Sequence, residues 1–177
     1  MKAVQVYFFS ELDPKVQAKV LDKNRDINVD HNWYEYIISE WNKKLESIGF
    51  INAEISFSGF YSQGDGCCFK SSLDLDHFLI NDFEPLKKEE IDIAYEPYLG
   101  WTAYRQGKFV SYGCLSNDEM NQLCDSLVEF INEYKVDLCV EIYEDLRKQY
   151  EYLTTDEAVK ETIELNEYVY LIDGASV

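Results

Sequence analysis

Carboxylates recur at every fourth position in the C-terminal half of this sequence, and they are its clearest candidates for chemistry. This set, called the acid row below, consists of Asp125, Glu129, Glu133, Asp137, Glu141 and Asp145. On an α-helix, a separation of four residues places side chains on one face, about 6 Å apart along the axis. Because successive phosphates of a nucleic acid strand have a similar spacing, the row indicates either a phosphate-mimicking surface that binds a basic protein or an ordinary solvated helix face.

The acid row has an energetic cost in the isolated helix. Like charges four residues apart destabilise a helix by about 0.2–0.5 kcal/mol per pair, so the row's successive repulsions cost roughly 1–2.5 kcal/mol together. A face of alternating Glu and Lys would avoid this cost. The spacing therefore favours a role for the row besides stability, although a solvated face remains the alternative.

A second candidate is the polar segment Ser62-Gln63-Gly64-Asp65-Gly66. A phosphate-binding loop would open a helix and carry a nearby Lys, whereas this segment joins two predicted strands. A calcium loop would supply several oxygen ligands, and Asp65 is the one carboxylate here. Two interpretations remain: a tight hairpin turn with glycines at positive φ, or a contact surface for a partner through Gln63 and Asp65.

Cysteine and histidine give weaker signals. The cysteines are Cys67, Cys68, Cys114, Cys124 and Cys139. Cys67 and Cys68 are adjacent, so on a strand they point to opposite faces and do not chelate a metal together. His31 and His77 have no partner that the sequence can place. A small enzyme with a site near Asp65, Cys67 and His77 is the weakest alternative, and we expect neither a cofactor nor a metal.

The element that carries the acid row should be one long helix. No Gly or Pro occurs between Ser116, a candidate N-cap with Asn117, and Gly174. Helical periodicity continues to Leu153, which predicts a helix about 55 Å long, unless it kinks near Lys135-Val136. Its apolar face consists of Leu123, Leu127, Ile131, Tyr134, Leu138, Ile142 and Leu146. Thr155 then caps a further helix.

Shorter elements precede this helix. The pattern predicts a helix over 13–24 with Ser10 as its N-cap, and a second helix from Asp30 or Asn32 to Ile48, ended by Gly49. The apolar positions of the second helix are Trp33, Tyr36, Ile37, Trp41, Leu45 and Ile48. Residues 75–82 are predicted as a short helix.

Alternating residues predict the strands. They lie at 2–9, in hairpins at 53–60 with 67–74 and within 101–113, and in the tail YVYLI before an Asp173-Gly174 turn. The mixed order of strands and helices predicts an α+β fold, with a mostly antiparallel sheet flanked by helices and one long C-terminal amphipathic helix. At 177 residues, a single domain over 1–177 is expected.

Composition limits the classes of partner. The chain has a net charge of −18, yet it is 46% hydrophobic and 15% aromatic, which is typical of a folded protein rather than a disordered acidic tail. Its field repels nucleic acid and acidic membranes, so we expect neither as a direct partner. No signal peptide and no apolar run of membrane-spanning length occur, so a cytoplasmic protein is predicted.

Four segments together resemble small acidic proteins of bacteriophages and mobile elements. They are FSEL (9–12), SFSGFYSQGDGCCF (56–69), YEYLTTDEAV (150–159) and NEYVYLIDG (166–174). The most specific is the SGFxSQGDG pattern, followed by the YEYLTxDEA and NEYxxxxDG patterns. The resemblance implies a phage-type origin and a single compact domain, and it brings no catalytic residues.

The acid row and this resemblance together predict a non-enzymatic binding protein. It would inhibit or sequester a host protein with a basic surface, as a nucleic-acid mimic of the anti-CRISPR or anti-restriction type. The alternative is an antitoxin-like or virion accessory interaction module, which would use the SQGDG loop and the aromatic surface.

Overall fold

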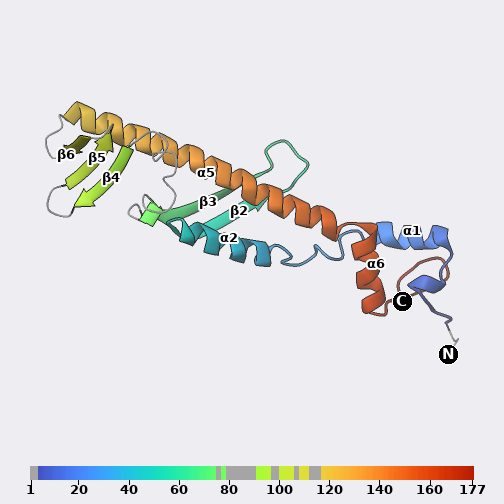
Figure 1. The fold of residues 1–177 in the computed structure, drawn as a ribbon. Coiled ribbons are helices and arrows are strands. Elements are labelled where there is room, and N and C mark those ends of the chain that lie inside the picture. Colours follow the sequence, from blue (N-terminus) through green and yellow to red (C-terminus); the bar gives the residue numbers. More distant parts are fainter. Residues whose placement is uncertain (1–3, 75–76, 79–90, 97–99, 106–107, 112–116) are drawn as a thin grey trace. The chain divides into compact units, whose positions relative to one another are not determined.

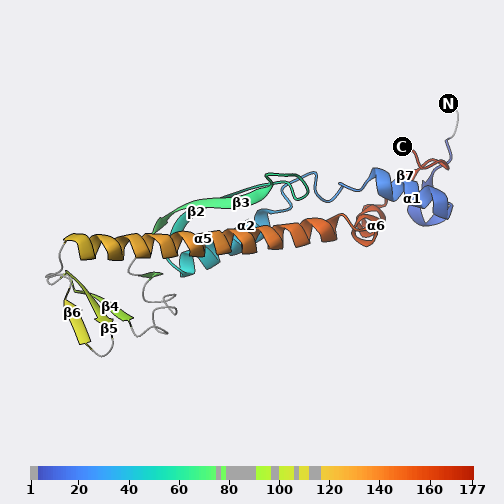
Figure 2. The same cartoon turned by 90° about the horizontal axis from the view of Figure 1, so that it is seen from above.

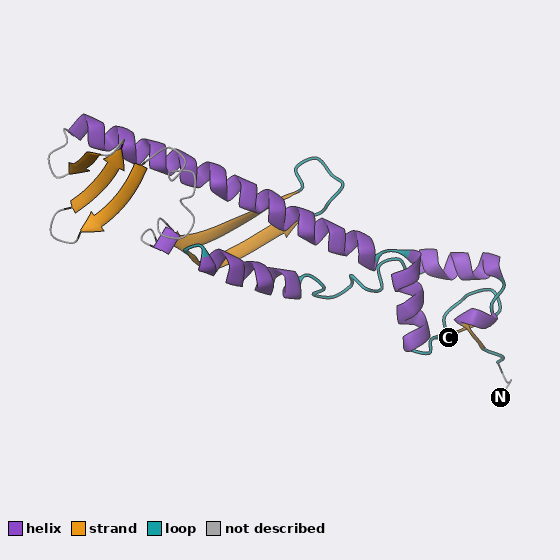
Figure 3. Ribbon diagram, viewed as in Figure 1, coloured by secondary structure: helices purple, strands orange, loops and turns teal. Residues whose placement is uncertain are grey.

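Helices and antiparallel strand pairs make up this α+β structure, a computed structural model (Figures 1 and 3). It describes residues 4–74, 77–78, 91–96, 100–105, 108–111 and 117–177, with the backbone alone between 91 and 129. The described strands form three small sheets, in the orders β1-β7, β2-β3 and β4-β5-β6, rather than one sheet. The predicted α+β class and the antiparallel pairing are confirmed.

The longest element is helix α5, which extends without a break from Asn117 to Leu153. The predicted length is confirmed, and the kink considered near Lys135 is absent. Leu138, Ile142 and Leu146 are buried, as the apolar periodicity predicts. The side chains of Leu123 and Leu127 lie outside the described residues.

Contacts divide the chain into two compact units: unit 1, residues 1–37 with 144–177, and unit 2, residues 38–143. Unit 1 contains α1 (Pro14–Lys23), α6 (Asp156–Leu165) and the short pair β1 (Tyr7–Phe8) and β7 (Val169–Tyr170). The core of unit 1 consists of Phe9, Leu12, Val20, Val159, Ile163 and Tyr170. The prediction of a single domain stays a prediction.

The predicted caps of unit 1 are partly right. Thr155 caps α6, since its side chain accepts from the Ala158 N–H, as predicted. The cap of α1 is Asp13, whose carboxylate accepts from the Lys15 N–H, and Ser10 instead belongs to the 3₁₀ turn η1 (Phe9–Glu11). Asp13 immediately precedes Pro14, so it takes the cap position that the predicted Ser10 is too early to fill.

Unit 2 is built on the hairpin of β2 (Phe50–Ser58) and β3 (Gly66–Leu73), which lies with most of α2 (Glu35–Ser47) alongside the part of α5 in this unit (Figures 1 and 2). Gly49 joins α2 to β2 at φ +96°, and an added Cβ would lie 2.9 Å from the Asp74 carbonyl oxygen. A glycine is therefore required at this junction.

Aromatic rings form the interior of unit 2. Phe78 is fully buried, and its ring lies 5.7 Å from Phe50 and 5.7 Å from Tyr134, measured between centroids. Phe69 packs edge-on against Phe50 at 5.4 Å. Tyr36 was predicted on the apolar face of α2, but it is 75% exposed, because at 100° per residue it lies on the side of the helix opposite the buried Leu45.

The remaining strands are β4 (Ile91–Glu96), β5 (Gly100–Arg105) and β6 (Lys108–Ser111). The β5–β6 hairpin was predicted, whereas the irregular 83–97 region gave no signal for β4. Of the short helix predicted at 75–82, residues 77–78 are helical and the rest lies outside the described residues. Of the strand predicted at 2–9, the described residues 4–9 form a strand only at Tyr7–Phe8, and residues 2–3 lie outside the described residues.

Candidate interaction surface on helix α5

Helix α5 carries the whole acid row, because a spacing of four residues keeps these positions on one helical face. The side chains of Glu133, Asp137, Glu141 and Asp145 are exposed. Those of Asp125 and Glu129 lie outside the described residues. The sequence was therefore right that the described part of this row faces solvent.

Two of these carboxylates are ion-paired. Glu141 Oε2 lies 3.0 Å from Lys44 Nζ on α2, and Asp145 Oδ1 lies 3.5 Å from Lys148 Nζ one turn further along α5. Among the described residues, Glu133 and Asp137 have no such ion pair. These two, called the open acidic pair below, carry the uncompensated charge of the described part of the row.

Apolar side chains lie beside the open acidic pair, and sequence reasoning missed them. Val136 and Val140 are 61% and 56% exposed, and each follows one of the two acids by three residues. Positions three apart are neighbours on a helix surface, so the valines and acids form adjacent strips. The signal was visible in the sequence as two valines off the apolar face of α5.

On the other side of the valines, unit 2 has a groove of about 600 Å³ between β3 and α5. One wall is Asp65 with Gly66 to Phe69 of β3, and its α5 wall is Asn132, Lys135, Val136, Cys139, Val140 and Tyr143. Lys135 Nζ lies 4.7 Å from the centre of the Phe69 ring, where cation–π attraction holds it. The groove is thus mainly apolar, with a few polar groups around it.

Cys67 and Cys139 are among the residues that line this groove, and neither thiol has the lowered pKa that a catalytic nucleophile needs. Burial raises the pKa of Cys67 from its ordinary 9.0 to about 12, and the neighbouring Cys139 and Cys68 add to the shift. Burial also raises the pKa of Cys139, against opposing effects from a Phe69 backbone hydrogen bond and Lys135. Since a nucleophile must be a thiolate, neither thiol is activated. Cys68 is exposed, as predicted for one of two adjacent cysteines on a strand.

The SQGDG loop is closed by its own aspartate. Asp65 Oδ2 accepts from the backbone N–H groups of Tyr61 at 2.9 Å and Ser62 at 2.6 Å, and Gly64 takes φ +94°. Asp65 therefore has a structural role in the turn, while Gln63 is exposed. The Tyr143 hydroxyl donates to the Gly59 carbonyl at 3.1 Å, which attaches the start of the loop to α5.

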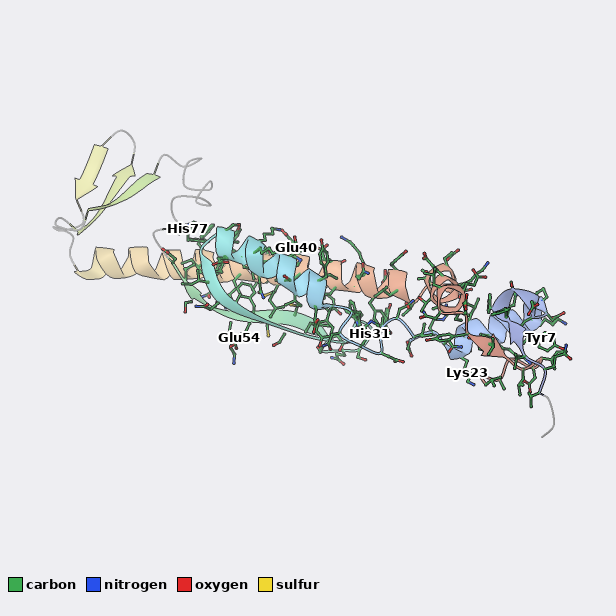
Figure 4. All side chains as sticks on the ribbon, turned by 90° about the horizontal axis from the view of Figure 1, so that it is seen from below. Tyr7, Lys23, His31, Glu40, Glu54 and His77 are labelled. Atoms are coloured by element: carbon green, nitrogen blue, oxygen red, sulfur yellow. The ribbon has the colours of Figure 1, made fainter. Side chains whose placement is uncertain are left out.

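The structure does not assemble the three residues of the enzyme alternative. Asp65 and Cys67 line the groove, but His77 follows the far end of β3, where its Nε2 lies 2.9 Å from the Ser47 carbonyl oxygen (Figure 4). The six steps along the strand from Cys67 to Leu73 span roughly 20 Å. His77 is not among the described residues that line the groove, so the enzyme alternative lacks its site.

The described residues contain no group of three or more His, Cys, Asp or Glu side chains arranged to hold a metal ion. None of their helices combines the length and the apolar character needed to cross a bilayer.

The chain matches one family model over residues 33–156, with the description "Domain of unknown function (DUF8835)". The matched range includes α2, the strands β2 to β6 and all of α5. Since it covers more than half of the sequence, the chain belongs to this family. Comparisons with curated proteins and with solved structures find no match.

Proposed function

We propose that this member of the DUF8835 family is a phage-type binding protein that inhibits or sequesters a basic host protein through the acid row of α5. The observation that carries the proposal is the open acidic pair: Glu133 and Asp137 are exposed one turn apart, and no described residue forms an ion pair with them. Their mutual repulsion lowers helix stability by about 0.2–0.5 kcal/mol, which a bound cationic surface would relieve.

The proposed mechanism is competition for a basic groove. Carboxylates spaced by about 6 Å along α5 would occupy positions that phosphates otherwise fill, and so exclude nucleic acid from the partner. This is the behaviour of an anti-defence factor of the anti-CRISPR or anti-restriction type, acting in the host cytoplasm. The net charge of −18 supports a protein partner, because it repels nucleic acid and anionic lipid.

The experiment begins with a pull-down from host lysate, followed by mass spectrometry and purification of the captured protein. Its affinity is then measured for the wild type, for Glu133→Lys with Asp137→Lys, and for the control Glu157→Lys with Glu161→Lys. The control makes the same charge change at exposed positions of α6 with the same spacing. Loss of binding in the first variant alone supports the proposal, and equal binding of both variants contradicts it.

A second candidate function is an antitoxin-like or virion accessory module that binds through the SQGDG loop. It is favoured by the exposure of Gln63 and of Tyr61, whose side chain is 73% exposed. Salt separates the two candidates. Affinity through the acid row should fall steeply with ionic strength, whereas an aromatic contact at the loop should be nearly insensitive to it.

A further inference from the structure

The groove between β3 and α5 lies along the edge of the hairpin that no other described strand pairs with. It contacts Asp65 and the next four residues, Gly66 to Phe69 of β3, and none of β2, the strand with which β3 pairs. Successive side chains of a strand point to opposite faces. A cavity that meets consecutive residues, and misses the paired strand, therefore follows the edge of β3 away from β2.

A backbone hydrogen bond gives the direction of this edge independently. The Gly66 N–H donates to Ser58 Oγ on β2 at 3.2 Å, so the backbone of Gly66 faces β2. Backbone groups alternate in direction along an antiparallel strand, and Cys67 directly follows Gly66. The N–H and C=O of Cys67 therefore face the groove, and pairing with β2 leaves them unused.

The opposite wall of the groove has matching chemistry for an extended chain. Val136 and Val140 present apolar surface one helical turn apart, and both are more than half exposed. Behind them on α5 lies the open acidic pair of Glu133 and Asp137. A segment in the groove would thus contact the backbone of β3 on one side and the two valines of α5 on the other, with the open acidic pair next to the valines.

We propose that this groove binds an extended peptide segment of a partner protein, rich in apolar and basic residues, which adds to β3 at Cys67. The charge of the surroundings selects this occupant, because two uncompensated carboxylates adjoin the groove and the chain as a whole is strongly acidic. Lys135, the cation of the described groove walls, is held over the Phe69 ring. Backbone pairing supplies sequence-independent affinity, and the valines select alternate apolar side chains. This inference goes beyond the acid-row proposal, since a peptide tests it without any host protein.

The probe is a capped octapeptide of alternating Lys and Val, with an alternating Glu and Val octapeptide as its charge control. Affinity is measured by isothermal titration, and amide hydrogen exchange reports on residues 65–69. The variant Val136→Ser with Val140→Ser removes apolar surface from the groove, and Leu165→Ser is the matched control, since Leu165 is an exposed residue of α6.

The Lys-Val peptide should slow exchange of the Cys67 amide by about tenfold or more, and the double serine variant should weaken its binding roughly tenfold. Leu165→Ser should bind as the wild type does, and the Glu-Val peptide should bind far more weakly. The proposal is overturned if the Lys-Val peptide fails to bind at millimolar concentration, or binds without protecting Cys67. Equal binding of the two peptides would overturn the choice of a basic occupant. A failure here leaves the lysate-derived partner and the acid row to be judged by their own experiment.

Discussion

Lys44 on α2 pairs with Glu141 on α5 at 3.0 Å, and this contact marks where the charge of the acid row is compensated. The same ammonium lies 3.9 Å from the centre of the Trp41 ring. One turn earlier on α5, Asp137 has no such pair among the described residues, and Glu133 before it has none either. A row that looks uniform in sequence is therefore uneven in its electrostatics.

Removal of the Lys44 charge should strengthen partner binding. In Lys44→Met, Glu141 would join the open acidic pair, and one more charge at about 8 Å is worth roughly twofold in affinity at low salt. The loss of an exposed ion pair should cost about 0–1 kcal/mol of stability. Titration against the partner checks this, with Lys43→Met, which removes a charge paired with Glu40 on α2, as control. Weaker binding of Lys44→Met would contradict the role given to the acids.

Asp65→Ala should loosen the SQGDG loop. The substitution removes the acceptor of the Tyr61 and Ser62 N–H groups, at a cost of about 1–3 kcal/mol. Amide exchange at residues 61 and 62 should accelerate, and thermal unfolding should occur at lower temperature. Gln63→Ala is the control, with an expected change within about 0.5 kcal/mol. Unchanged exchange in Asp65→Ala would show that the turn does not depend on this carboxylate.

Cys67 should resist alkylation at neutral pH. Its pKa is raised to about 12, first by burial, so its thiolate becomes abundant only as the pH approaches that value. Iodoacetamide followed by peptide mass spectrometry should show the exposed Cys68 modified before Cys67 at pH 8. Modification of Cys67 at the rate of Cys68 would be inconsistent with its burial in the groove wall.

Phe78→Ala should destabilise unit 2 by about 3–5 kcal/mol, because a fully buried ring in contact with Phe50 and Tyr134 is replaced by a cavity. Denaturant unfolding measures the loss. Phe8→Ala serves as the control, since its ring is half exposed and its truncation should cost less than about 1 kcal/mol. Similar losses in the two variants would place Phe78 outside the main core of the unit.

Local sequence signals were sufficient to predict most of the fold. Helix α5 could be predicted because apolar residues recur at helical spacing with no Gly or Pro between them. The β2–β3 hairpin could be predicted because apolar and polar residues alternate on both sides of a glycine-containing turn. Strand β4 escaped prediction because Pro85 and Pro97 flank an acidic stretch, which obscures the alternation that leads into its pairing with β5. Asp13 replaced Ser10 as a cap because cap geometry depends on the exact residue at which the helix begins.

The candidate site shows a sharper division. Exposure of the acids could be predicted, since helical spacing alone decides which face they share. The pairing of Glu141 with Lys44 could not, because these residues are distant in sequence and meet through the packing of α2 on α5. The use of Asp65 within its own turn was also hidden, since the same carboxylate would suit a ligand.

The central claim is tested most directly by the affinity of the purified host partner for Glu133→Lys with Asp137→Lys at low ionic strength. The swap turns the repulsions with Glu129 and Glu141 into attractions, while the two lysines repel each other as the two acids did. Stability should therefore rise by about 0.8–2 kcal/mol, and a loss of binding would not reflect unfolding. We predict that affinity falls at least tenfold, while Glu157→Lys with Glu161→Lys binds within about twofold of wild type. Wild-type affinity in the Glu133 and Asp137 variant would contradict binding through the acid row.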